Sequence, residues 1–263
     1  MKSARILLPL LSALLAAVLI LPLLSFSHQS DIQITAHRGD SSRAPENTLP
    51  AIESAIACRA DFVEVDVQET KDGVLVLLHD GSVKRTSDDT GKLHDLTYEE
   101  LLSMDFGSWF SEEFQDVKIP TLKQALEVCR GRIRMNIELK SGTESDTLTD
   151  RALELIEETG MEEQVVISSV SYQYLKEVKE KNPRIPTGYI LSSDGSDYYD
   201  DDNIDFFSIC SGHIDARGAD RIHAAGKALH IWTINTANKM KAARDLGADN
   251  IITDCPSLAE RVL

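Results

Sequence analysis

Short apolar runs alternate with stretches of helical spacing from residue 32 to residue 262, and few folds are compatible with this alternation. A repeated strand–helix order is typical of a parallel sheet with crossover helices. The runs expected as strands are residues 32–36, 62–67, 133–139, 165–169, 187–191, 206–210, 229–234 and 251–253. The stretches expected as helices are residues 46–58, 122–129, 146–159, 172–181, 216–225, 237–246 and 257–262. Eight such strands in a chain of 263 residues predict an α/β fold, the closed (β/α)8 TIM barrel.

One further apolar run, residues 74–79, interrupts the alternation. It follows the second expected strand after only six residues, whereas a parallel crossover needs a dozen or more. Asp72-Gly73, between the two runs, is typical of a tight turn. We therefore expect an antiparallel hairpin whose returning arm brings His79 back near Asp66.

This hairpin opens a small insertion, which we expect over about residues 68–120, between the second strand and the next barrel helix. A Thr-x-x-Glu capping box predicts a short helix at residues 97–102 within it. The predicted domain organisation is an N-terminal segment, residues 1–27, followed by one barrel domain, residues 28–263.

The N-terminal segment has the character of a targeting sequence. Lys2 and Arg5 precede a 19-residue apolar run, residues 6–24, which is near the ~20 residues that span a bilayer. We expect an apolar helix that anchors the protein in a membrane, with the positive end in the cytoplasm and the barrel outside. Residues 25–27 also offer a small-x-small cleavage site, so a cleaved signal peptide and a secreted protein is the first alternative. A buried core helix is the second.

The charge of the chain excludes some classes of partner. The whole sequence has a formal net charge of −16, and residues 28–263 carry 25 Lys+Arg against 43 Asp+Glu, a charge of −18. Such a domain repels nucleic acid and anionic lipid surfaces. An anionic substrate therefore needs local cations in its binding site. Nothing in the sequence specifies the oligomeric state.

The four cysteines are widely spaced and form no C-x-x-C pair. Export would permit disulfides, but four cysteines allow three connectivities and the sequence favours none of them. Cys58 and Cys129 fall at expected helix ends and Cys210 in an apolar run, which favours buried free thiols.

Two carboxylates stand out within the second expected strand. Because successive side chains of a strand point to opposite faces, Val63, Val65 and Val67 share one face and Glu64 and Asp66 the other. The two acidic side chains then lie roughly 7 Å apart in an otherwise apolar run. An edge strand with one solvated acidic face would explain them, but a bound cation would also relieve their repulsion.

Other chemically active side chains fall at the same end of the predicted barrel, where the strands finish. They are His37, Arg38, Glu64, Asp66, His79, Asn136, Glu138 and Lys140. Three carboxylates without cysteine describe an oxygen-ligand site for a hard cation, Ca²⁺ or Mg²⁺ rather than Zn²⁺. Two histidines suit a general base and a general acid near neutral pH. The two basic residues supply the positive charge that a phosphate group requires.

The order and spacing of these residues match a known family. The matching motifs are His37-Arg38-Gly39, Ala44-Pro45-Glu46-Asn47-Thr48, Glu64-x-Asp66-Val67, Thr70-x-Asp72-Gly73, His79-Asp80, Gly107-Ser108-Trp109-Phe110, Ile119-Pro120-Thr121-Leu122, Glu138-x-Lys140, Trp232-Thr233-Ile234-Asn235 and Ile251-Ile252-Thr253-Asp254-Cys255-Pro256. From residue 32 to the end, the chain resembles the glycerophosphodiester phosphodiesterase family. The resemblance implies a (β/α)8 barrel with a small insertion, in agreement with the fold expected above.

The resemblance also implies roles for individual residues. Glu64, Asp66 and Glu138 would bind a divalent metal, Ca²⁺ or Mg²⁺, while His37 and His79 would form the acid/base pair.

Arg38 and Lys140 would contact the phosphate group, and Trp232 would form a wall of the glycerol pocket. Glu46 and Asn47 match the Glu-Asn-Thr motif of the family without an assigned role. Capping of the first barrel helix is an alternative explanation for Asn47.

The implied reaction is metal-dependent hydrolysis of a glycerophosphodiester, a small molecule, to sn-glycerol 3-phosphate and an alcohol. Glycerol-phosphate polymers of a cell wall and lysophospholipids are alternative substrates, and exposed Trp109, Phe110 and Phe114 in the insertion would favour the lipid. A catalytically silent barrel used as a binding module is the alternative from another functional class.

Overall fold

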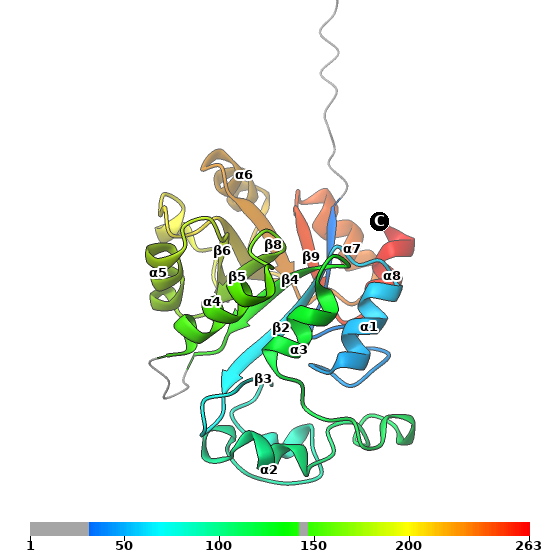
Figure 1. Ribbon diagram of the computed structural model, residues 1–263. Helices are drawn as coiled ribbons and strands as arrows, with labels where there is room; N and C mark the ends of the chain where they lie inside the picture. The colour runs from blue at the N-terminus through cyan, green and yellow to red at the C-terminus, as the bar shows by residue number, and fades with distance from the viewer. Residues whose placement is uncertain (1–31, 142–146) are drawn as a thin grey trace, which may run out of the picture. The chain divides into compact units, whose positions relative to one another are not determined.

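The computed structural model describes residues 32–141 and 147–263 (Figure 1). Within these ranges, eight parallel strands form the barrel: β1 (Gln33–Ala36), β2 (Phe62–Glu69), β4 (Arg134–Leu139), β5 (Val165–Ser169), β6 (Thr187–Leu191), β7 (Phe206–Cys210), β8 (Ala228–Trp232) and β9 (Asn250–Thr253). Their order is β1-β9-β8-β7-β6-β5-β4-β2, and β1 also pairs with β2. This last pairing closes the sheet, which confirms the predicted parallel barrel.

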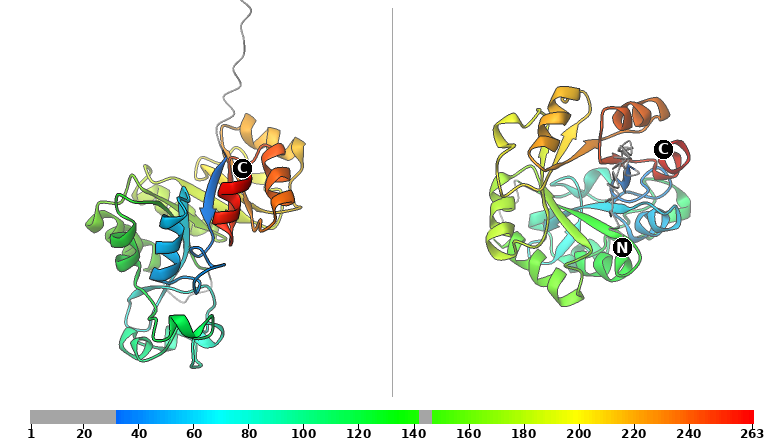
Figure 2. Two further views of the ribbon diagram at one scale, coloured as in Figure 1. Left: turned by 90° about the vertical axis from the view of Figure 1, so that its right-hand side faces the viewer. Right: turned by 90° about the horizontal axis from the view of Figure 1, so that it is seen from above.

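Helices cover the outside of the barrel, as Figure 2 shows from above. They are α1 (Leu49–Ala57), α3 (Leu122–Cys129), α4 (Leu148–Thr159), α5 (Tyr172–Lys181), α6 (Ala216–Ala224), α7 (Ala237–Asp245) and α8 (Pro256–Val262). In α4, for example, Leu148, Ala152 and Ile156 recur every fourth residue and are fully buried against the strands. The core therefore lies between the strands and this outer layer.

The predicted start of the first helix, residue 46, is wrong. Helix α1 begins at Leu49 because Thr48 has an extended backbone and its side chain accepts a hydrogen bond from the Ala51 amide. Pro50 then occupies the first turn, where its missing N–H costs nothing.

The inside of the barrel is filled near the beginnings of the strands. The ring of Phe206, on β7, stacks on the imidazole of His230, on β8, with a centroid distance of 4.2 Å. Gly188, on β6, leaves the space for this ring, because a Cβ atom there would lie 2.0 Å from it. The interior is thus a packed core at this end.

The predicted hairpin is confirmed. Strand β3 (Leu75–Leu77) runs antiparallel to the end of β2, with Val67 opposite Leu77. The Gly73 amide donates to the Thr70 carbonyl across the turn, and Gly73 has a φ of +84°. At the far end, the Leu78 amide donates to the carbonyl of Asp66 over 3.0 Å, so the arm returns to the barrel as expected.

Strand β3 and the residues after it form an insertion with a hydrophobic core of its own. It contains the short helices η1 (Val83–Arg85), η2 (Leu93–Asp95), α2 (Tyr98–Leu102) and η3 (Glu112–Phe114). Its buried residues are Val76, Leu78, Val83, Leu93, Leu101, Met104, Phe106 and Ile119. The predicted capping box is present at α2, where Thr97 and Glu100 exchange hydrogen bonds. Figure 1 shows the insertion at the end of the barrel toward which β2 points.

All four cysteines lie within the described residues and are free thiols. Cys129 is buried as expected, but Cys58 and Cys210 are only partly buried, so the expectation of burial is wrong for these two. The apolar helix expected within residues 1–27 lies outside the described residues, so the membrane anchor and the signal peptide both stay predictions. In the part of the chain that the structure describes, no helix combines the length and the apolar character needed to cross a membrane.

The packing around Gly188 gives a first prediction. Gly188→Ala forces a methyl group into the Phe206 ring, and we expect the free energy of unfolding to fall by about 1–3 kcal/mol in urea titrations. Gly81→Ala is the matched control, because no atom lies within 4 Å of the added Cβ atom. Equal stabilities of the two variants would contradict the account of the barrel interior.

Candidate active site

The register of β2 against β4 brings three acidic side chains together at the open end of the barrel. Glu64 lies opposite Asn136, and Asp66 lies opposite Glu138. One oxygen from each of Glu64, Asp66 and Glu138 lies within 4.8 Å of the others. Strand β2 is buried between β1 and β4 rather than at an edge, so the alternative of a solvated edge strand is wrong.

The environment of this cluster fits a hard divalent cation. Oε2 of Glu64 accepts a hydrogen bond from the Arg38 amide, but Oε1 is buried and has no hydrogen-bond partner. Burial, with the charge of Asp66 beside it, raises the pKa of Glu64 to about 8. Burial and Asp66 also raise the pKa of Glu138. An unpartnered oxygen among three carboxylates is an arrangement that a hard divalent cation can satisfy.

Two basic side chains compensate part of this negative charge. The Lys140 ammonium lies 2.7 Å from Oε1 of Glu138 and 3.2 Å from Oδ1 of Asp66. Nε of Arg38 lies 3.3 Å from Oδ2 of Asp66. Burial would raise the pKa of Asp66, but these two cations outweigh it, and the pKa lies below its ordinary value.

His37 follows β1 and is held by a carboxylate from the far end of the chain. Its Nδ1 atom lies 2.6 Å from Oδ1 of Asp254, and the other oxygen of Asp254 accepts a hydrogen bond from the Asn235 side chain. With Nδ1 engaged, Nε2 is the ring nitrogen that this contact leaves unoccupied. Burial opposes the charged form of His37, but the bond to Asp254 and the charge of Glu64 outweigh it and raise the pKa.

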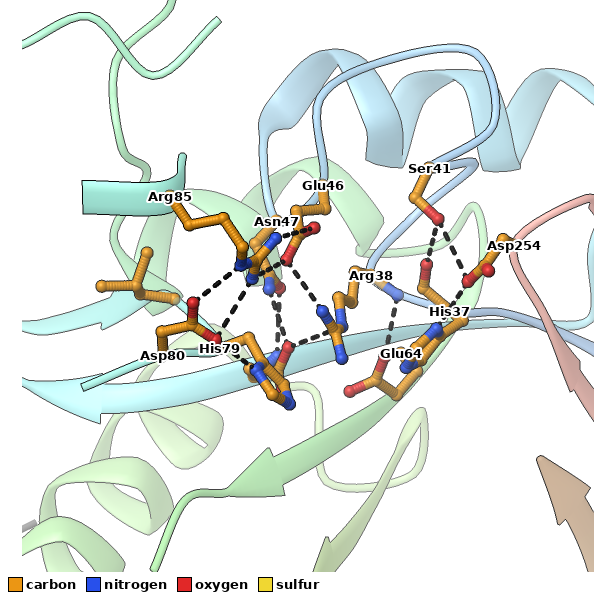
Figure 3. A network of polar contacts seen from close by, with 12 residues as sticks. His37, Arg38, Ser41, Glu46, Asn47, Glu64, His79, Asp80, Arg85 and Asp254 are labelled. Carbon is orange, nitrogen blue, oxygen red and sulfur yellow. Dashed lines mark hydrogen bonds and ion pairs between the residues drawn. The ribbon is translucent and has the colours of Figure 1, made fainter. Parts of the chain in front are cut away.

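His79 lies at the end of the returning hairpin arm and has the same arrangement. Its Nδ1 atom lies 2.7 Å from Oδ1 of Asp80, its neighbour in sequence. The Gln68 side chain fixes this turn, because its amide donates to the carbonyls of Leu78 and Asp80 over 2.5 and 2.9 Å. Figure 3 shows His37 and His79 on opposite sides of Arg38 and Glu64.

The predicted site residues surround a cavity of about 150 Å³. Its lining is His37, Arg38, Glu64, His79, Asn136, Glu138, Lys140, Ser168, Val170, Ile190, Ser208, Trp232 and Ile252. One part of the lining is charged, while Val170, Ile190 and Trp232 provide an apolar part. The indole N–H of Trp232 donates to the Ser208 carbonyl over 2.9 Å, which fixes the ring. Asp66 does not line the cavity but contacts Arg38 and Lys140, which do.

Several residues at the site were not assigned from the sequence. Asn47 donates to Oδ2 of Asp66 over 2.8 Å and accepts a hydrogen bond from the Asp66 amide. The alternative that Asn47 caps α1 is therefore wrong, because Thr48 is the cap. Glu46 binds Nη1 of Arg38 over 2.9 Å. Asp254 and Asp80, which orient the two histidines, were visible only as parts of the family motifs.

Comparison with known proteins identifies the family. The model of the glycerophosphoryl diester phosphodiesterase family matches residues 37–258. The chain belongs to this family. A glycerophosphodiester phosphodiesterase of Caldanaerobacter subterraneus is 33% identical over 228 residues, covering 85% of this chain and 94% of the relative. Another from Bacillus altitudinis is 33% identical over 245 residues, covering 88% and 97%.

Solved structures of glycerophosphoryl diester phosphodiesterases have the same fold. A phosphodiesterase of Oleispira antarctica, solved in complex with the product sn-glycerol-3-phosphate, is 29% identical with a TM-score of 0.79, and the match covers 88% of this chain and 96% of that one. A glycerophosphodiester phosphodiesterase of Agrobacterium tumefaciens is 26% identical with a TM-score of 0.75, covering 88% and 100%. The family resemblance of the sequence is thereby confirmed.

The contact between His37 and Asp254 gives a second prediction. Asp254→Asn keeps an oxygen for the imidazole but removes the negative charge that favours its protonated form. Without that charge, the effect of burial, which disfavours the protonated imidazole, becomes the larger one. We therefore expect the pKa of His37 to fall. An NMR titration of the metal-free protein measures it, and an unchanged pKa would show that Asp254 does not set the charge of His37.

Proposed function

We propose that this chain hydrolyses glycerophosphodiesters to sn-glycerol 3-phosphate and an alcohol. One observation carries the proposal: two imidazoles, each bound at Nδ1 by a carboxylate, line the same cavity beside three clustered carboxylates. The named activities of the relatives and the product complex of the Oleispira protein support the same reaction.

The divalent metal would be held by Glu64, Asp66 and Glu138. The unpartnered Oε1 of Glu64 and the raised pKa values of Glu64 and Glu138 favour a cation there. When bound, it would neutralise charge on the phosphate group and polarise the phosphorus–oxygen bonds. Oxygen ligands alone suit both Ca²⁺ and Mg²⁺. Asn47 would keep Asp66 in place through its two hydrogen bonds.

The two histidines would perform the proton transfers. Nε2 of one imidazole accepts the proton of the nucleophile, which is water or the neighbouring glycerol hydroxyl, as its oxygen attacks phosphorus. The bond from phosphorus to the alcohol oxygen breaks, and the other imidazole donates its proton to that oxygen. With the glycerol hydroxyl as nucleophile, water opens the resulting cyclic phosphate in a second step. The carboxylates on Nδ1 hold the rings so that both Nε2 atoms can take part.

The basic side chains would bind the phosphate oxygens. Arg38 and Lys140 both line the cavity, and Nε of Arg38 has no hydrogen-bond partner. Burial lowers the pKa of Lys140, but the neighbouring carboxylates of Asp66 and Glu138 outweigh it, so the ammonium stays charged. These local cations allow an anionic substrate to enter a domain whose overall charge is −18.

The size of the cavity favours a small substrate. The cavity has a volume of about 150 Å³. Its short apolar part, formed by Val170, Ile190 and Trp232, suits the glycerol group. Lysophospholipid is the second candidate, because Trp109 in the insertion is 41% exposed and its ring packs against that of Phe110. Trp109 does not belong to the cavity lining, so the small diester is preferred.

The decisive experiment uses residues 28–263 and measures sn-glycerol 3-phosphate release from glycerophosphocholine with Ca²⁺, with Mg²⁺ and with a chelator. We expect release with at least one metal and none with the chelator. Hydrolysis of lysophosphatidylcholine to lysophosphatidic acid and choline, with no sn-glycerol 3-phosphate released from glycerophosphocholine, would support the lipid instead. Release that persists in chelator would contradict the metal site.

Variants of the two histidines test their roles. We expect His37→Ala and His79→Ala each to lower kcat by about 10²- to 10⁴-fold, because each removes one proton transfer. His223→Ala is a matched control, since His223 also pairs with a carboxylate, Asp249, but lies outside the cavity. Near-normal turnover of either cavity variant with metal bound would contradict the acid/base pair.

A further inference from the structure

Arg85 binds two carboxylates at once beside the cavity. Its Nη1 and Nη2 atoms donate to the two oxygens of Glu46 over 2.7 and 2.9 Å. Its Nε and Nη2 atoms donate to the two oxygens of Asp80 over 2.7 and 3.2 Å. Four of the five N–H groups of a guanidinium are therefore used by protein carboxylates. Figure 3 shows Arg85 between these two side chains.

Each of these carboxylates also contacts a residue of the proposed reaction. Glu46 accepts a hydrogen bond from Nη1 of Arg38, and Asp80 lies against Nδ1 of His79. Arg85 itself does not line the cavity. Arg38 lines the cavity and its Nε makes no hydrogen bond, whereas four of the five N–H groups of Arg85 are hydrogen-bonded to Glu46 and Asp80. Arg85 is therefore placed to act through its neighbours rather than on the substrate.

The backbone of Arg85 is fixed by the insertion. Arg85 ends the short helix η1, which Ser82 caps through its side chain. Val83 in the same turn is fully buried in the core of the insertion, and its amide donates to the Gly91 carbonyl. The guanidinium therefore extends from a backbone that packing already holds in place.

We propose that Arg85 is a positioning residue that holds Asp80, and through it the His79 imidazole, in the orientation needed for proton transfer. This inference rests on the proposed function. Asp80 and His79 are each about a third exposed, at 35%, so water competes for both of them. A guanidinium on both oxygens of Asp80 fixes the plane of the carboxylate, which a single hydrogen bond to the imidazole does not. Arg85 also lowers the pKa of Asp80 to about 2, so the carboxylate stays an acceptor for Nδ1–H.

The test compares Arg85→Met with Arg132→Met. Arg132 binds the two oxygens of Glu53 over 2.8 and 2.7 Å at similar exposure, 43% against 44% for Arg85, but away from the cavity. We expect Arg85→Met to lower kcat about 10- to 100-fold with little change in KM, and Arg132→Met to do neither. Arg85→Lys should recover only part of the loss, because an ammonium cannot bind both oxygens as a fork. Equal kcat values for the two methionine variants would overturn the proposal.

A double-mutant cycle tests the route through Asp80. If Arg85 acts through this carboxylate, Arg85→Met adds little to the loss caused by Asp80→Asn. Fully additive losses in kcat would overturn that route. If the Arg85→Met variant is unstable, the same cycle can be measured with Arg85→Lys in its place.

A measurement without turnover separates this proposal from the proposed function. NMR spectra of ¹⁵N-histidine-labelled protein report which nitrogen of His79 carries the proton, with His79→Gln for assignment. We expect the Nδ1–H form in the native protein and in Arg132→Met, and a mixture of tautomers in Arg85→Met. A changed spectrum with no hydrolysis by the native protein would refute the proposed function and leave the contact intact. An unchanged spectrum would overturn the proposal itself.

Discussion

The burial of carboxylates in adjacent strands is the constraint on which the site depends. Glu64 and Asp66 are 3% and 1% exposed, and the β2–β4 register adds Glu138 to them. Each buried charge without a partner costs several kcal/mol, so the surrounding structure has to supply cations and donors. The Arg38 amide, the Lys140 ammonium and the Asn47 side chain do so. Oε1 of Glu64 remains without a hydrogen-bond partner, so this cluster is not a closed salt-bridge network.

Three basic side chains lie among the carboxylates at the cavity of this acidic domain. Arg38, Lys140 and Arg85 each contact two carboxylates at or next to the cavity. The pairing keeps these cations in fixed positions. A phosphate group that enters the cavity therefore meets preoriented charge, which is more effective than charge that must reorganise.

Local patterns in the sequence predicted the barrel and most of the cavity lining. The roles of Asp254 and Asn47 were not predicted, because they depend on contacts and backbone geometry that local patterns do not contain. Alternation alone placed Glu64 and Asp66 on one face, and a connection of six residues required the hairpin that carries His79. Asp254 could not be paired with His37 in this way, because 217 residues separate them and only closure of the barrel through β1 and β9 joins them. The role of Asn47 depends on a backbone φ of +57°, which no spacing rule predicts for asparagine.

The insertion links folding to the proposed chemistry. The barrel supplies the carboxylates, Lys140 and His37, but the hairpin and the segment after it supply His79, Asp80 and Arg85. Along the hairpin arm, Leu75 and Leu77 pack in the hydrophobic core of the barrel, whereas Val76 and Leu78 pack in that of the insertion. Packing of both cores thus determines where one of the two imidazoles lies relative to the three clustered carboxylates. A substitution of Val76 or Leu78 that loosens the insertion core would displace His79 more than the barrel strands, because these two residues belong to the insertion core alone.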